Sequence, residues 1–396
     1  MVMKKLIAIS VVFALVVGTA FAFDVSGSVT GSVNVLEGNN VKDSKVTSSA
    51  GMDRLRLDGS GENDDGTFGG YIRAEAGSPA SIDFKGLFSA DPDDPETNFN
   101  DFFNGGGGGF DGYVWWKPID QLKMWIGGNG GDGFFGKEGY SCWMFYQTAG
   151  DTAVASAGNA WGGGHSQWPY TFRHAFYGGD GGDSFYATIS PTEMVDINLN
   201  IPFFNGGEVG DVLKSLVAQV SLKFDFGNIA VTYTGDAGKA TNGNAYVYFN
   251  LGAVENLSLD VGVGLTIPGD VEGQPIFAGL AAKYDVSDAF GLKARFLVGL
   301  GGDNKETGIV FDVLPYFVVN DTVTAFLSGG VTMKAPDGDD AVIGFHVNPY
   351  VQVGSEWGPK FLAGFRLWTN GAKGGGDKAE DSLVNWSVPI ALMVTF

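Results

Sequence analysis

The sequence is poor in the residues that most often build catalytic and metal sites. It contains one cysteine, Cys142, and three histidines, His165, His174 and His346. One cysteine cannot form an intrachain disulfide framework, and three scattered histidines do not have the spacings of common zinc motifs. Neither a Ser/His pair nor a pair of acids with enzyme-like spacing is recognisable. We therefore expect no metal, no cofactor and no enzymatic activity.

Charge is scarce, and positive charge is the scarcer sign. Charged residues make up 17% of the chain, and 24 Lys and Arg stand against 45 Asp and Glu, for a net charge of −21. Contacts to phosphate backbones need clustered cations, so we expect no nucleic-acid partner. Beyond the first 22 residues there is no run of about 18 apolar residues, so no transmembrane helix is expected.

The N-terminus has the three parts of an export signal. Lys4 and Lys5 precede an apolar stretch over residues 6–17, and the segment ends in Ala20-Phe21-Ala22. A charged region, an apolar region and an A-x-A site together predict a cleavable secretory signal peptide. An uncleaved membrane anchor is the alternative. We expect residues 1–22 to be the signal peptide and residues 23–396 to form the exported protein.

Most of the remaining chain alternates apolar and polar residues with a period of two. Clear examples lie at residues 216–226, 257–265, 290–298 and 361–367. Such alternation predicts strands with one apolar face, whereas helices need apolar repeats at three and four residues. The strands run about 9–13 residues, longer than the usual 5–6, and a tilted strand needs 9–11 to cross a bilayer. In these segments the apolar face carries no charge.

The connections between the predicted strands are alternately short and long. Short turns are expected at residues 227–228, 255–256, 287–288, 320–321 and 356–358. Longer polar loops are expected at residues 235–243, 268–275, 301–307, 335–341 and 370–382. Short turns on one rim and long loops on the other are typical of outer-membrane barrels, and less so of soluble sandwiches or lipocalins.

We predict a single all-β domain, a transmembrane antiparallel up-and-down barrel with about 18 strands. The predicted strands are 25–36, 52–60, 67–76, 110–117, 121–127, 183–190, 193–201, 214–226, 228–235, 244–253, 256–266, 276–286, 289–299, 308–318, 322–332, 342–354, 359–369 and 384–396. The number is even, which keeps both termini and the short turns on the periplasmic side and the long loops outside. Sixteen or twenty strands remain open. Pro315, Pro349 and Pro389 predict bulges or strand ends.

Two segments of this sequence resemble those of known families. Residues 386–396 end on Phe396 with an apolar residue at every second position. This resembles the C-terminal signature of bacterial outer-membrane proteins and implies a location in outer-membrane lipid and insertion by the barrel-assembly machinery. Residues 24–35 resemble the start of spirochaete major outer sheath proteins, which implies a porin that is also a surface antigen or adhesin. The porin resemblance also suggests a homotrimer.

A barrel of 16–18 strands leaves an aqueous channel, and charged residues at inward positions would line it. The candidates are Arg54, Arg56, Arg73, Glu75, Lys123, Lys223, Asp225, Lys283, Asp285, Lys293, Arg295, Asp312 and Arg366. The alternative for each of them is a solvated wall position without a selective role. We expect an outer-membrane porin for passive diffusion of small hydrophilic solutes and ions. The competing hypothesis is a surface adhesin or antigen whose barrel only displays loops.

Two connections, near residues 77–109 and 128–182, are too long for ordinary loops and are rich in glycine and aromatic residues. We expect one of them to fold into the lumen and narrow it. A surface-exposed loop is the first alternative, and an aromatic path for sugars or apolar solutes is the second.

Overall fold

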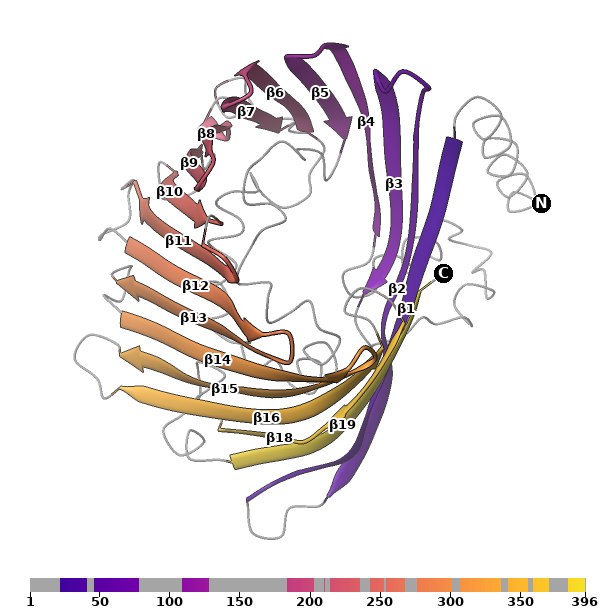
Figure 1. The fold of residues 1–396 in the computed structure, drawn as a ribbon, viewed down its shortest axis with the longest axis vertical. Coiled ribbons are helices and arrows are strands. Elements are labelled where there is room, and N and C mark those ends of the chain that lie inside the picture. The colour runs from indigo at the N-terminus through magenta and orange to yellow at the C-terminus, as the bar shows by residue number, and fades with distance from the viewer. Residues whose placement is uncertain are drawn as a thin grey trace, which may run out of the picture.

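In the computed structural model, the chain closes into an antiparallel β-barrel (Figure 1). The structure describes residues 22–40, 46–77, 109–127, 184–202, 210, 214–235, 243–252, 254–267, 276–300, 307–335, 341–354, 359–369 and 384–395. Strands that follow one another in the chain are neighbours in the wall, and β1 closes the ring by pairing with β19. This is the up-and-down arrangement that the alternating turns and loops predict.

In the part of the chain that the structure describes, nineteen strand segments make eighteen crossings of the wall. They are β1 (Ala22–Asn39), β2 (Thr47–Glu62), β3 (Phe68–Gly77), β4 (Gly109–Ile119), β5 (Leu122–Gly127), β6 (Ser184–Thr192), β7 (Val195–Pro202), β8 (Val217–Phe224), β9 (Gly227–Thr234), β10 (Asn244–Leu251), β11 (Leu257–Thr266), β12 (Ile276–Ser287), β13 (Phe290–Leu300), β14 (Thr307–Asn320), β15 (Val323–Ala335), β16 (Val342–Gly354), β17 (Lys360–Gly364), β18 (Arg366–Thr369) and β19 (Val384–Thr395). Both β17 and β18 pair with β16 and β19, so they are two halves of one crossing. The predicted count of eighteen is confirmed.

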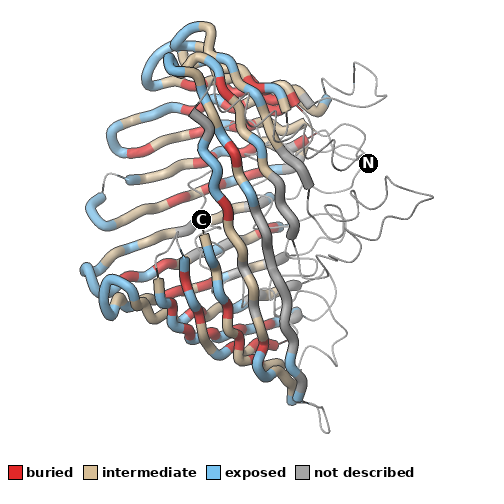
Figure 2. The backbone as a smooth tube through the Cα atoms, turned by 90° about the vertical axis from the view of Figure 1, so that its right-hand side faces the viewer, coloured by how far each residue is buried: buried red, intermediate tan, exposed pale blue. Residues whose placement is uncertain are grey.

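The outer face of the barrel is apolar. Along β12, for example, the exposed residues Ile276, Leu280, Tyr284 and Val286 lie at alternate positions, and each is more than 40% exposed. Figure 2 shows this alternation of exposed and buried residues along the strands. A soluble protein would bury such a surface, whereas a membrane barrel turns it toward lipid. The predicted apolar exterior is confirmed.

The short turns lie on one rim, where Figure 2 shows a row of exposed residues. The turn after β8 is Asp225–Phe226, two residues earlier than expected, because Gly227 already pairs with Phe224. Gly227 has a φ of +150°, and a Cβ there would overlap the carbonyl oxygen of Asn250. Only glycine fits this close approach between β9 and β10, so the turn precedes it.

Two of the three prolines interrupt the wall at one place. Phe365, between β17 and β18, lies opposite Pro349 of β16, and its N–H donates to the Pro349 carbonyl at 2.9 Å. Its neighbour Gly364 lies opposite Pro389 of β19 in the same register. Neither proline has an N–H to donate to the middle strand. Opposite Pro389, β1 also shifts register between Asn34 and Leu36. Pro315 makes neither the predicted bulge nor a strand end, since the register of β14 runs past it unshifted, but the pairing with β15 omits Leu314 and Pro315.

The turn between β2 and β3 carries a carboxylate that the local structure stabilises. Asp65 accepts hydrogen bonds from the Thr67 hydroxyl at 2.6 Å and from the Thr67 N–H at 3.1 Å. The bond from the Thr67 side chain is the main cause that keeps the pKa of Asp65 below its usual range. A lowered pKa means that folding favours the ionised carboxylate, so this stabilisation is lost as the pH falls through that pKa.

We therefore expect the Thr67→Val variant to be less stable than the wild type at neutral pH, with a difference that narrows under acid conditions. The part that remains is the loss of the bond that Asn63 Nδ2 donates to the Thr67 hydroxyl at 3.1 Å, which does not depend on pH. The matched control is Thr322→Val, because the Thr322 hydroxyl donates at 2.9 Å to Asn320, which does not titrate. Its cost should not change with pH. Denaturant unfolding at a series of pH values measures both, and parallel pH profiles for the two variants would contradict the assignment.

Several expectations fall on residues outside the described ranges. They are the signal peptide, apart from Ala22 at the start of β1, and the two long connections near 77–109 and 128–182. Among the described residues, no helix is long and apolar enough to cross a bilayer.

Candidate functional site

The candidate site is the inward face of the wall, which carries the strand residues that alternate with the exposed apolar ones. Many of its side chains are polar and buried. They include Asp196, Asn198, Asn200, Gln219, Ser221, Thr232, Asp260, Lys293, Asp312, Ser328, His346, Asn348, Arg366 and Ser387. This polar inner face is the reverse of a soluble barrel with an apolar core.

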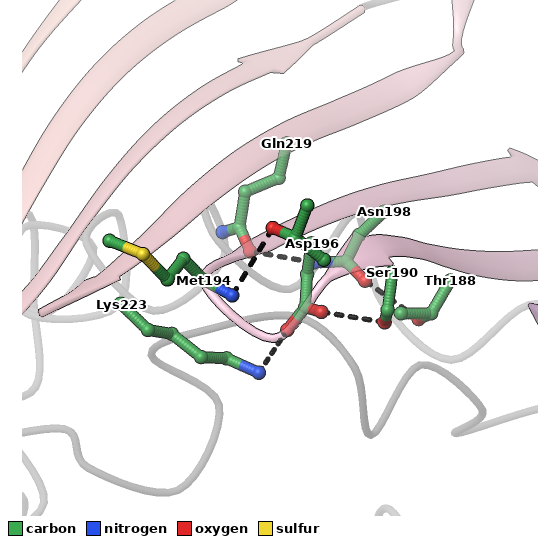
Figure 3. A network of polar contacts seen from close by, with 8 residues as sticks. Thr188, Ser190, Met194, Asp196, Asn198, Gln219 and Lys223 are labelled. Atoms are coloured by element: carbon green, nitrogen blue, oxygen red, sulfur yellow. Dashed lines mark hydrogen bonds and ion pairs between the residues drawn. The ribbon is translucent and has the colours of Figure 1, made fainter. Parts of the chain in front are cut away.

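A chain of side-chain hydrogen bonds crosses four neighbouring strands, β6 to β9, and Figure 3 shows its part from Thr188 to Gln219. The Thr188 hydroxyl donates to Asn198 Oδ1 at 2.6 Å, and Asn198 Nδ2 donates to Gln219 Oε1 at 3.2 Å. Gln219 Nε2 then donates to Thr232 Oγ1 at 3.0 Å. Because a buried amide costs free energy unless it is hydrogen-bonded, this chain stabilises the polar wall.

Next to this chain, toward the short rim, lies a charged group of three residues (Figure 3). Asp196 accepts from the Ser190 hydroxyl at 2.7 Å and pairs with Lys223 Nζ at 2.6 Å. Lys223 was a sequence candidate, whereas Asp196 was missed. The sequence pattern that could have identified Asp196 is its position between the apolar residues Val195 and Ile197, which in an alternating strand places it on the inward face.

The structure joins two more candidates to carboxylates. Arg73 Nε pairs with Asp58 Oδ1 at 2.8 Å, and Lys283 Nζ pairs with Asp285 Oδ2 at 3.0 Å. In both pairs a tyrosine hydroxyl also donates to the carboxylate, Tyr71 to Asp58 and Tyr316 to Asp285. The wall thus presents donors and acceptors side by side.

Three candidates lie deep in the wall, with Asp312 and Arg366 0% exposed and Lys293 7% exposed. Asp312 faces His346, whose Nε2 lies 4.0 Å from Asp312 Oδ1. Arg366 lies over the Trp368 ring at 4.3 Å, and Lys293 lies 6.0 Å from the centre of the Tyr316 ring. His346 and the aromatic partners were missed, because only the strand register brings them together.

The remaining candidates are placed through the strand ladder. In the backbone register, Arg56 lies opposite Glu75, Arg54 lies opposite Gly77, and Arg295 lies opposite Asp312. Lys123 lies over two indole rings, at 4.4 Å from Trp115 and 4.9 Å from Trp125. Asp225 differs from expectation, because β8 ends at Phe224 and Asp225 lies exposed in the turn at the short rim.

Two parts of the inward face are apolar, which the expectation of a polar lumen did not include. One cluster contains Leu314, Tyr350, Leu362 and Ala391 with Phe326 and Met393, and the other contains Trp125, Tyr186 and Val217 with Tyr113 and Trp115. The first lies on β14–β19 and the second on β4–β8, and these parts of the wall face each other across the barrel (Figure 1). The inner wall is therefore amphipathic.

Comparison with known proteins identifies the fold. No family model and no curated protein matches the chain. Among solved structures, the anion-selective porin from Comamonas acidovorans superposes with a TM-score of 0.54 and 14% identity, over 94% of this chain and 99% of that one. The fold is that of bacterial outer-membrane porins.

Two further porin structures agree with this fold. Pseudomonas aeruginosa OccK11 has a TM-score of 0.54 and 9% identity, over 95% of this chain and 96% of that one. Salmonella typhi OmpF, in complex with daunomycin, has a TM-score of 0.53 and 10% identity, over 94% and 97% of the two chains. At these identities the likeness concerns the fold. The N-terminal resemblance to major outer sheath proteins stays a prediction.

Proposed function

We propose that this protein is an outer-membrane porin through which small hydrophilic solutes and ions diffuse passively. The observation that carries the proposal is the closed barrel of eighteen crossings with an apolar outer face and a charged inner face. Lipid solvates the first face, and the second can lie against water. Barrels of 16–18 strands enclose a lumen wider than their own side chains can fill.

The ion pairs of the wall account for the solutes that such a channel would favour. The pairs Arg73–Asp58, Lys223–Asp196 and Lys283–Asp285 offer both donors and acceptors to a passing solute. A hydrophilic solute can exchange part of its hydration shell for these groups, whereas an apolar solute gains nothing from them. No bond is made or broken in this process, so the proposal needs no catalytic residue.

The same proposal covers the route to the membrane. Residues 1–22 would direct export, and β19, followed by Phe396, would be the strand that the barrel-assembly machinery binds. A homotrimer in outer-membrane lipid is the assembly we expect. Antibody labelling of intact and permeabilised cells, with crosslinking of the assembled protein, tests the location and the number of subunits.

Reconstitution of the mature protein, residues 23–396, in planar bilayers tests the transport function. We expect stepwise conductance increases and diffusion of small sugars and ions from loaded liposomes. An electrically silent barrel that binds host matrix proteins would instead support the display of surface loops.

Two neighbouring positions on β12 provide a sharper test. The side chain of Lys283 is 38% exposed on the inward face, and Tyr284 is 47% exposed on the outward face. In a background with Cys142→Ser, a bulky thiol reagent added from water should reduce the conductance of the Lys283→Cys variant. It should leave that of the Tyr284→Cys variant unchanged. Equal reduction in both, or reduction only in the second, would contradict a conducting lumen.

A further inference from the structure

Four aromatic side chains form a continuous strip on the inward face of β3, β4 and β5. We call Tyr71, Tyr113, Trp115 and Trp125 the aromatic strip. Tyr71 pairs with Tyr113 in the strand ladder, and Trp115 pairs with Trp125. The Tyr71 and Tyr113 rings lie 5.3 Å apart. Trp125 is only 2% exposed, whereas the other three are partly exposed, so the strip has a buried base and an accessible part.

A glycine sets the orientation of the Trp115 indole. A Cβ at Gly69 would lie 2.6 Å from each of the Cε2, Cζ2 and Nε1 atoms of Trp115. Three adjacent ring atoms at one distance mean that the indole lies across Gly69 on β3. The indole therefore rests on the wall at Gly69, and the Lys123 ammonium lies over the ring, 4.4 Å from its centre. A larger residue at position 69 would force the indole away from the wall.

Charged groups flank the strip at both ends. At one end, the Arg73–Asp58 pair and the Tyr71 hydroxyl lie together, with the Arg73 guanidinium 5.3 Å from the centre of the Tyr71 ring. At the other end, the Lys123 ammonium lies over both indoles. Arg73 lies opposite Asp111 on β4, four residues or about 13 Å along the strand from Trp115, and the aromatic strip itself covers about 7 Å of this length.

The combination of these groups selects one class of solute. A carboxylate and a guanidinium that touch each other carry no net charge together, so they favour neither a simple cation nor a simple anion. They suit a hydroxyl group, which both donates and accepts. The aromatic faces between the ends offer apolar surface to the C–H face of a saturated ring. A neutral ring that is apolar on its faces and hydroxylated around its edge matches both features, and that is a carbohydrate.

We propose that the aromatic strip is an affinity site for neutral carbohydrates on the wall of the barrel. Its role in selecting transported solutes rests on the proposed porin function, but binding itself does not need a conducting pore. Weak affinity would raise the concentration of sugar at the wall and still allow release.

Binding of maltotriose to the folded mature protein in detergent micelles, followed by calorimetry, tests the site directly. The Trp115→Ala variant should bind maltotriose roughly tenfold more weakly, since a stacked ring contributes on the order of one factor of ten. The matched control is Trp116→Ala, because Trp116 is the next residue on β4 but is 53% exposed on the outer face. It should bind as the wild type does. If Trp115→Ala does not fold, Trp115→Leu replaces it, with the same expected direction.

Benzoate, which is flat but anionic, serves as the comparison ligand and should not displace the sugar. Equal affinities in the Trp115 and Trp116 variants, displacement by benzoate, or no maltotriose binding by the folded wild type would each overturn the site. The bilayer measurement separates this failure from that of the proposed function. A wild type that conducts without binding sugar overturns only the affinity site, and one that binds sugar without conducting overturns only the channel.

Discussion

Replacing Leu280 by arginine should lower the free energy of unfolding in lipid vesicles by about 2–4 kcal/mol. Leu280 lies in the interior of β12 and is 41% exposed on the outer face. If this face lies against hydrocarbon, the guanidinium must be drawn out of water near the middle of the bilayer, where nothing solvates it. Urea unfolding of vesicle-reconstituted protein, followed by tryptophan fluorescence, measures the loss.

The control is the same substitution on the same strand, at Val286. This residue is also on the outer face, 53% exposed, but it lies one residue from the end of β12 at the short rim. An arginine there can reach the interface, so the cost should be below about 1 kcal/mol. Equal small costs at both positions would mean that the outer face is in water, and the membrane-spanning interpretation would then fail.

The strand pattern was predictable because every crossing of a barrel in lipid alternates apolar outward residues with polar inward ones. Alternation at positions such as Leu280 and Val286 depends only on the residue's own strand, so the period of two reveals it. The eighteen crossings and the short rim follow from counting such segments. The Lys283–Asp285 pair was also within reach, since the two residues lie two positions apart on one face.

The rest of the site depends on the register between strands, which the sequence does not show. Arg73 meets Asp58, fifteen positions earlier, only because β2 and β3 pair at that register. His346 meets Asp312 across a third strand, and a shift by one residue would send one of the two to the outer face. The register also puts Trp115 over Gly69. The inner wall is therefore partly aromatic there, whereas the sequence predicted a polar one.

The second large effect is expected on β15, the strand that lies between Asp312 on β14 and His346 on β16. Replacing Gly330 by alanine should destabilise the barrel by about 1–3 kcal/mol, a typical cost of overpacking. Gly330 lies on β15 between Asp312 and His346. A Cβ there would overlap Asp312 Oδ1 and would lie 2.6 Å from His346 Cε1 and 2.7 Å from the Phe311 carbonyl oxygen. Two buried side chains and a backbone would have to move.

The neighbouring glycine is the matched control. At Gly329, on the opposite face of the same strand, the nearest atom to an added Cβ is the His346 carbonyl oxygen at 3.6 Å, an ordinary contact. The Gly329→Ala variant should therefore keep wild-type stability. Combining Gly330→Ala with His346→Ala should cost less than the sum of the two single changes, because removal of the imidazole makes room for the methyl group. Strictly additive costs would show that the crowding lies with Asp312 or the Phe311 backbone and not with His346.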